Sequence, residues 1–260
     1  MIKKYLKVFW LISKSAVLVS LNSRYGAVFF IFGKVLRIVT FSYFLFILVS
    51  STKTLANYTV LQTILFFLVF NLVDSGAQFL FRDVYRFRSR VVNGELDGYF
   101  SKPISPLLRS LLGGIDVLDF VVLIPLFGVI VWLIPQVATS IFQIILFGLL
   151  LINSFIIATA FHIFVLGLGI TTTEVDHAIM MYRDFTSMGK IPIDVYRYPI
   201  SAIFSTIIPI GVMMTLPAKA LMGLASPQAI VISLAIGISV FYLSLKYWNY
   251  AVTKYSSASS

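Results

Sequence analysis

The 260-residue sequence contains no cysteine, only two histidines and only 12% charged residues. Without cysteine, the chain can form no disulfide bond, no thiolate metal site and no thiol-dependent catalytic site. Globular proteins have about 25% charged residues, and a mean hydropathy of +0.98 is too apolar for a soluble protein with a polar surface. These shortages exclude a soluble globular domain and indicate a membrane protein.

Sequence motifs of several enzyme classes are also absent. The chain has no GxxxxGK[ST] phosphate loop, so we do not expect it to bind ATP in that way. It has no HExxH zinc motif and no GxSxG elbow, and its histidines, His162 and His177, are not spaced as metal ligands. We therefore predict no catalytic residue, no cofactor and no metal site, and we predict that the chain is not an enzyme.

Apolar runs of about 20 residues, the length that crosses a bilayer as a helix, recur along the sequence. We predict an all-α membrane protein in which residues 1–260 form a single transmembrane domain. The six predicted spans are residues 27–50, 58–81, 117–134, 141–170, 199–216 and 228–248. The interval 209–227 carries three prolines and two glycines with little charge, which favours a re-entrant segment before the last span.

Residues 1–24 are basic and amphipathic. Lys3, Lys7, Trp10 and Lys14 recur at i, i+4, i+7 and i+11, which places them on one face of a helix. We predict a helix that lies in the membrane interface with its lysines toward anionic headgroups. The alternative is a basic tail that only sets the topology.

Some polar residues fall inside the predicted spans. Lys34 and Arg37 must snorkel or face protein or water, because a charge at the bilayer centre costs at least ~2.5 kcal/mol. One stripe of the second span carries Asn71, Asp74 and Gln78. Asp74 either pairs with a basic residue of a neighbouring helix or lines a substrate path together with the two amides. We interpret His162 as a packed histidine bonded to a neighbouring helix rather than as a proton relay.

Lysine and arginine are distributed unevenly between the two predicted sides. Eighteen of the 20 fall in the amino-terminal part, in 82–112, in 171–198 and at the carboxyl end, whereas Lys53 and Lys219 fall on the other side. Because cytoplasmic segments carry an excess of these residues, we place both termini and both loops in the cytoplasm, and 209–227 outside. Topology and anionic lipid then explain the net charge of +10, and we predict no nucleic-acid partner.

The loop 82–112 carries six of the basic residues and three of the acidic ones. Within it, residues 93–107 read NGELDGYFSKPISPL. The Asn-Gly pair breaks a helix that leaves the second span, and the Lys-Pro-Ile-Ser-Pro run stiffens the return. We expect Tyr99 and Phe100 at the surface. Such a loop suits docking into a cleft on a soluble partner; the alternative is a solvated loop with aromatics at the membrane surface.

The run NGELDGYFSKPISPL resembles the segment between the second and third spans of ABC-2 type permeases. The residues that match the pattern of that segment are Gly94, Glu95, Leu96, Asp97, Lys102, Pro103 and Pro106. The order of features also resembles the family: an amphipathic amino-terminal helix, six spans and a proline-rich segment before the last span. The segments 51–57 and 135–140 are shorter than in many members, so a polysaccharide or large-domain specialisation is not expected.

The resemblance implies a permease of an ATP-driven exporter in the cell (plasma or inner) membrane. Two permeases, identical or homologous, would form the path for a hydrophobic or amphipathic substrate, and two separate ABC ATPase subunits would bind their cytoplasmic loops. The implied coupling residues are Gly94, Glu95, Leu96, Asp97, Tyr99, Phe100, Lys102, Pro103 and Ile104. The alternative is a stand-alone secondary transporter or channel, for which only Asp74 and His162 offer buried ionisable groups.

Overall fold

The computed structural model describes residues 2–22, 24–172 and 175–256, and within these residues it contains helices and no β-strand. Five helices in this part of the chain are long and apolar enough to cross a membrane. They are α2 (Arg24–Thr52), α3 (Val60–Phe81), α7 (Val117–Val137), α8 (Ile141–Thr172) and α12 (Pro227–Thr253). The all-α membrane fold and five of the predicted spans are therefore confirmed.

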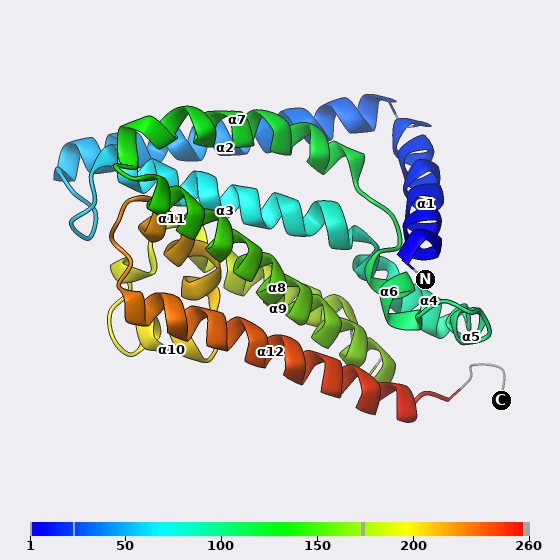
Figure 1. Ribbon diagram of the computed structural model, residues 1–260. Coiled ribbons are helices and arrows are strands. Elements are labelled where there is room, and N and C mark those ends of the chain that lie inside the picture. The colour runs from blue at the N-terminus through cyan, green and yellow to red at the C-terminus, as the bar shows by residue number, and fades with distance from the viewer. Residues whose placement is uncertain (1, 23, 173–174, 257–260) are drawn as a thin grey trace.

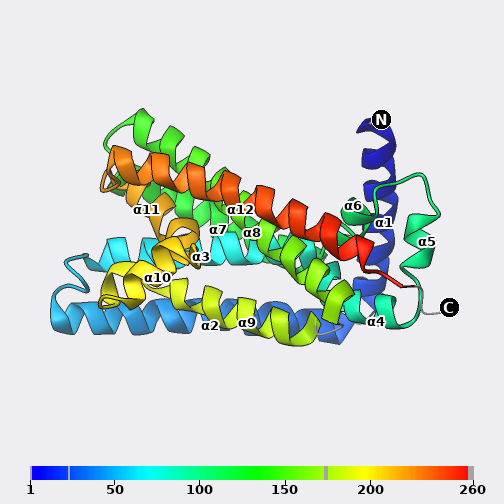
Figure 2. The same cartoon turned by 90° about the horizontal axis from the view of Figure 1, so that it is seen from below.

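The long helices form a bundle with two different ends (Figure 1). One end, which we call the loop end, carries α1 (Ile2–Asn22), η1 (Arg82–Arg86), α4 (Phe87–Val92), α5 (Asp97–Phe100), α6 (Pro106–Leu111) and the last turn of α12. The opposite end, the turn end, carries the short connections at 53–59, 138–140 and 222–226. Both views show α1 lying across the axis of the bundle (Figures 1 and 2), as a helix in a membrane interface would.

The interval 171–198, predicted as a second loop, does not stay at one end of the bundle. Its residues 173–174 lie outside the described residues. After them, α9 (Val175–Ser187) starts at the loop end and runs back along the bundle (Figure 2). The Tyr182 ring of α9 lies 4.9 Å from the His162 ring of α8, so the two helices pack against each other.

The chain then continues to the turn end through η2 (Met188–Lys190) and η3 (Ile193–Val195). There the Asp194 carboxylate accepts hydrogen bonds from the Tyr58 hydroxyl at 3.0 Å and from the Lys219 ammonium at 2.7 Å. The structure differs from the prediction because α9 is amphipathic. Its charged residues share one face, so it lacks the continuous apolar run by which a span is recognised.

The predicted fifth span, residues 199–216, is not a continuous helix. The segment consists of α10 (Ile200–Thr206), η4 (Gly211–Thr215) and α11 (Leu216–Leu221). Its helical parts are bent by 76° at a break that contains Pro209. Proline has no amide hydrogen to donate and clashes with the preceding turn, so a helix does not continue unchanged through it.

Residues 200–223, which we call the re-entrant dip, begin and end at the turn end. Ser154, about 20 Å along α8 by the helical rise per residue, donates a hydrogen bond to the Met213 carbonyl at 2.6 Å. Further along, Gly223 lies so close to Gln143 in the first turn of α8 that an added Cβ would collide with its amide. The dip thus reaches about mid-depth and returns, and α9 makes the sixth passage along the bundle.

A buried ion pair joins three of the long helices. The Lys34 ammonium of α2 pairs with the Asp119 carboxylate of α7 and donates to the Ser75 hydroxyl of α3 at 3.5 Å. Lys34 is 8% exposed and Asp119 is fully buried. Of the environments predicted for Lys34, the structure shows contact with protein, and the opposite charge compensates for removing the ammonium from water.

Replacing Asp119 by alanine should destabilise the protein strongly, because the Lys34 ammonium would remain buried without its counter-charge. Loss of one partner from a buried pair costs about 3–5 kcal/mol. We expect Asp119→Ala to lower the heat-denaturation midpoint of the detergent-purified protein, and Lys34→Met combined with Asp119→Leu to recover most of the loss.

The matched control is the pair Arg88–Asp176, 3.2 Å apart, whose side chains are 54% and 55% exposed. Because an exposed pair contributes at most about 1 kcal/mol, Arg88→Ala should barely move the midpoint. Equal midpoints for Asp119→Ala and Arg88→Ala would contradict a stabilising role for the buried pair.

Because the chain has no natural cysteine, single cysteines can report the course of α9. Tyr198, which is 84% exposed, follows α9, and His177 is exposed near its start. We expect a membrane-impermeant maleimide to label Tyr198→Cys and His177→Cys from opposite sides, and Tyr198→Cys from the same side as Lys53→Cys. Labelling of Tyr198→Cys and His177→Cys from one side would rule out a crossing by α9.

Candidate functional site

Residues 82–112, which we call the loop unit, are folded into a compact structure at the loop end. The Asp83 carboxylate accepts two hydrogen bonds from the Arg90 guanidinium at 2.5 and 2.6 Å. Arg109, on the returning arm, lies 3.9 Å from the same carboxylate. Gly94, with φ +73°, adopts the left-handed conformation just after α4, where glycine is unstrained. Asp83 therefore holds the outgoing and returning arms together.

Four of the predicted coupling residues face outward. They are Glu95, Phe100, Lys102 and Pro103, which we call the docking surface. The Glu95 side chain is 56% exposed, and Phe100 is 38% exposed at the end of the four-residue helix α5. Gly94, Asp97 and Ile104 are half-buried. The structure thus presents a short helical turn with charges of both signs and an aromatic ring to the surroundings.

Leu96 and Tyr99 point inward. Leu96 is fully buried, and Tyr99 is 9% exposed. The Tyr99 ring centroid lies 5.8 Å from the Arg90 guanidinium and 5.0 Å from that of Arg109. The prediction that Tyr99 is a surface aromatic is therefore wrong: its ring offers a π face to both cations. Tyr99 supports the docking surface from below.

The amino-terminal helix packs on the returning arm of the loop unit. The Lys4 ammonium donates to the Pro103 carbonyl at 2.6 Å, and the Tyr5 hydroxyl accepts from the Ser105 amide at 3.4 Å. The four residues predicted to share one face of α1 are all exposed: Lys3, Lys7, Trp10 and Lys14. α1 is therefore bonded to the last residue of the docking surface and to the segment that follows it.

The end of the chain reaches the other side of the docking surface. The Tyr255 ring, just after α12, lies 5.4 Å from the Phe100 ring. Burial and the neighbouring Asp97 carboxylate raise the pKa of Tyr255 to about 12. Because its phenol stays protonated at neutral pH, this contact adds no charge beside the docking surface.

A second candidate site is a cavity of about 480 Å³ between α2, α3 and α9. Its lining carries three cations and two carboxylates: Arg37, Asp74, Arg183, Asp184 and Lys190. Sequence reasoning missed the three residues from α9 and η2, because it placed them in a loop. The signal that could have found them is the segregation of polar and apolar residues on a helix of this length.

The three polar residues of the predicted stripe on α3 lie in different environments in the structure. Asp74 lines the cavity and accepts a hydrogen bond from the Gln78 amide at 2.9 Å. Gln78 is buried and accepts from Arg82 at 3.3 Å. Asn71 is fully buried and donates to the Phe67 carbonyl of its own helix at 2.7 Å. Of the three predicted lining residues, Asp74 alone is among those that line this cavity.

His162 is packed in the core, as predicted, but its bond is not to a neighbouring helix. Its Nδ1 lies 2.7 Å from the Ala158 carbonyl of the same helix. Its ring contacts the rings of Phe81, Tyr85 and Tyr182 at 4.8 to 6.3 Å. His162 is 2% exposed and is not among the residues that line the charged cavity.

Comparison with known proteins gives one match. A family model described as "ABC-2 family transporter protein" matches residues 35–259, which include the loop unit and the cavity. A search of curated proteins and a search of solved structures found no match. The family match covers most of the chain and agrees with the multi-pass helical fold. The chain therefore belongs to the ABC-2 transporter family and is a membrane-spanning permease component of an ABC transporter.

Proposed function

We propose that this permease is the transmembrane subunit of an ATP-driven exporter in the cell membrane, with its loop end and both termini in the cytoplasm. Two permeases, identical or homologous, form the path for a hydrophobic or amphipathic substrate. Two separate ATPase subunits drive transport through the docking surface. In this proposal the chain contributes the path and the loop unit that receives the movement, and its partners hydrolyse ATP.

The observation that carries this proposal is that buried and bonded residues hold the docking surface in place from behind. Glu95 and Phe100 project from a turn whose other side is fixed by the buried Leu96. The Asp83–Arg90 contact closes the unit behind them. Because η1 and α4 continue directly from α3, a displacement of α5 reaches a membrane-crossing helix without an intervening flexible linker.

The same displacement also reaches α1 through the contact of Lys4 with the Pro103 carbonyl. ATP can drive the cycle only if the ATPase pair binds it differently in two arrangements of the permease. In our proposal, the docking surface and α1 move together between these arrangements. The membrane helices then alternate between a closed and an open path.

The charged cavity supports a path beside α9. Arg183 and Asp184 are both exposed on α9, at a depth between the two ends of the bundle. A charge that faced lipid at that depth would cost at least ~2.5 kcal/mol. This face therefore meets water or a second permease in the membrane. In our proposal Asp74 lines this path from the opposite wall.

The distribution of basic residues supports a cytoplasmic loop end. The passage of α9 moves Arg197 toward the turn end, but the six basic residues of the loop unit and the lysines of α1 stay at the loop end. An excess of lysine and arginine marks cytoplasmic segments. At the turn end, Lys219 is paired with Asp194.

Exchanging the charges of the docking surface should detach the ATPase. The double variant Glu95→Arg, Lys102→Glu keeps the net charge but reverses both signs. If these residues belong to the core of the interface, the loss is at least ~2 kcal/mol, or about 30-fold in affinity. The measurement is the amount of ATPase subunit that co-purifies with the permease in mild detergent.

The control exchanges the exposed ion pair Arg88–Asp176 at the loop end, in the variant Arg88→Asp, Asp176→Arg. Its side chains are exposed to a similar extent, and the reversed pair can re-form. Co-purification should stay at the wild-type level. Retention of the ATPase by the Glu95→Arg, Lys102→Glu variant would refute the assignment of the docking surface.

The proposed path should change its accessibility during the ATPase cycle. Ser187 lines the cavity, whereas Ser233 on α12 is fully buried. We expect Ser187→Cys to react with a water-soluble maleimide at different rates in the nucleotide-free and the vanadate-trapped complex, and Ser233→Cys to react in neither. Identical rates for Ser187→Cys in both states would exclude the cavity from the moving path.

A further inference from the structure

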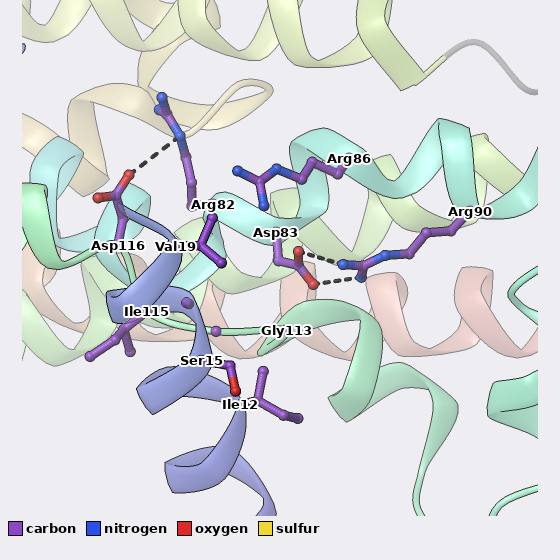
Figure 3. A pocket seen from close by; sticks show the side chains of 12 residues that line it. Ile12, Ser15, Val19, Arg82, Asp83, Arg86, Arg90, Gly113, Ile115 and Asp116 are labelled. Carbon is purple, nitrogen blue, oxygen red and sulfur yellow. Dashed lines mark hydrogen bonds and ion pairs between the residues drawn. The ribbon is translucent and has the colours of Figure 1, made fainter. Parts of the chain in front are cut away.

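A separate cavity of about 210 Å³ lies at the loop end beneath α1 (Figure 3). We call it the headgroup pocket. One wall is the face of α1 that carries Ile12 and Val19. The opposite wall carries Arg82 and Arg86, and Asp116 lines the pocket beside them. The pocket is distinct from the cavity beside α9 and from the docking surface.

The charges in the headgroup pocket do not balance. Asp83 accepts two hydrogen bonds from Arg90, and Asp116 lies 3.5 Å from Arg82. Among the described residues, Arg86 has no acidic partner. Figure 3 shows its guanidinium extended between Arg82 and Asp83 without a dashed contact. The pocket therefore presents one uncompensated cation with several donors directed into it.

Two glycines let the walls of this pocket approach each other closely. A Cβ added at Gly113 would overlap the Asp83 carboxylate, so the chain can pass that close only without a side chain. Gly114 has φ +141°, and a Cβ there would lie 3.0 Å from Ala16 of α1. The glycine pair lets α1 and the Asp83 carboxylate approach the same strip of backbone.

An apolar groove of about 420 Å³ begins one helical turn deeper into the bundle. Phe79 of α3 precedes Arg82 by three residues, and Phe120 of α7 follows Asp116 by four. Their ring centroids are 5.5 Å apart, and Ile124 continues the groove. Along these two helices, a cationic pocket at the membrane boundary is thus followed by an apolar groove.

We propose that the headgroup pocket binds the phosphate of an anionic phospholipid, whose acyl chain lies along the apolar groove. A guanidinium matches phosphate oxygens with paired donors, and Arg86 is available to provide them. α1 lies across the bundle, as expected for a helix at the level of the headgroups. Free phosphate would satisfy the pocket alone, but it would leave the adjoining groove without a ligand.

The bound lipid would also connect two parts of the molecule. Its phosphate would lie between α1 and the start of the loop unit, the two elements that move together in the proposed coupling. An anionic lipid there would contact both α1 and Arg86, in addition to the Lys4 contact that joins α1 to the loop unit. The inference itself does not require the ATPase to dock at Glu95.

The test is native mass spectrometry of the whole permease–ATPase complex with added phosphatidylglycerol, phosphatidylcholine or inorganic phosphate. We expect phosphatidylglycerol to remain bound to the wild-type complex and Arg86→Ala to weaken that binding about tenfold, the effect of one lost charge-assisted contact. Arg88→Ala is the matched control, because Arg88 is two residues away and bonded to Asp176 at 3.2 Å.

Equal retention of phosphatidylglycerol by Arg86→Ala and wild type would overturn the proposal. So would displacement of the lipid by an equal concentration of inorganic phosphate, since the pocket would then recognise the free anion. If Arg86→Ala does not assemble, a photo-crosslinking phosphatidylglycerol on the wild-type complex decides the question. Crosslinks should map to residues 12–19, 82–86 or 113–127, and their absence from these segments would equally refute the site.

Discussion

The requirement that a charge inside an apolar bundle meet an opposite charge or water governs much of this structure. Lys34 satisfies it by pairing with Asp119, which draws α2 and α7 together across α3. At the boundary, Arg82 meets Asp116 in the same way. The polar face of α9 satisfies the requirement differently, by opening onto a cavity of about 480 Å³. Paired charges thus fix the helices, and unpaired polar surface marks where water or a partner belongs.

The loop end combines a closely bonded interior with an outward surface on which the Glu95 and Phe100 side chains stay exposed. Asp83 joins the two arms, and Tyr99 lies between two guanidinium groups beneath the exposed turn. In the proposed coupling, stiffness of the loop unit matters because a flexible loop would absorb a displacement instead of passing it to α3. The contact of α1 with the Pro103 carbonyl adds a second route for the same displacement. In that proposal, the loop unit transmits the displacement through its rigid geometry.

The sequence predicts those parts of the molecule whose signal is local. Apolar runs of bilayer length are sufficient to locate five helices, and the turn residues around Gly94 are sufficient to locate the loop unit. The segregation of polar and apolar residues identifies α9 as a helix, but its course along the bundle could not be predicted. That course depends on the contact of Asp194 with Tyr58, which is 136 residues away in the sequence. Tyr99 is buried against Arg90 and Arg109, which only folding brings together. Its burial could therefore not be predicted from the residues next to it in the sequence. The features that could not be predicted are therefore those that depend on contacts between residues far apart in the sequence.

The re-entrant dip bears on how the proposed exporter would keep small ions from leaking across the membrane between transport events. Met213 and Met214 lie fully buried in its deepest turn, where flexible thioether side chains can fill an irregular gap. Ser154 bonds the dip to α8, and at the rim of the dip Lys219 of α11 bonds to Asp194 of η3. In the proposed exporter, a buried segment of this kind at the turn end would block the passage of protons and small ions between transport events. A cell could then keep many copies of this permease without dissipating its proton-motive force.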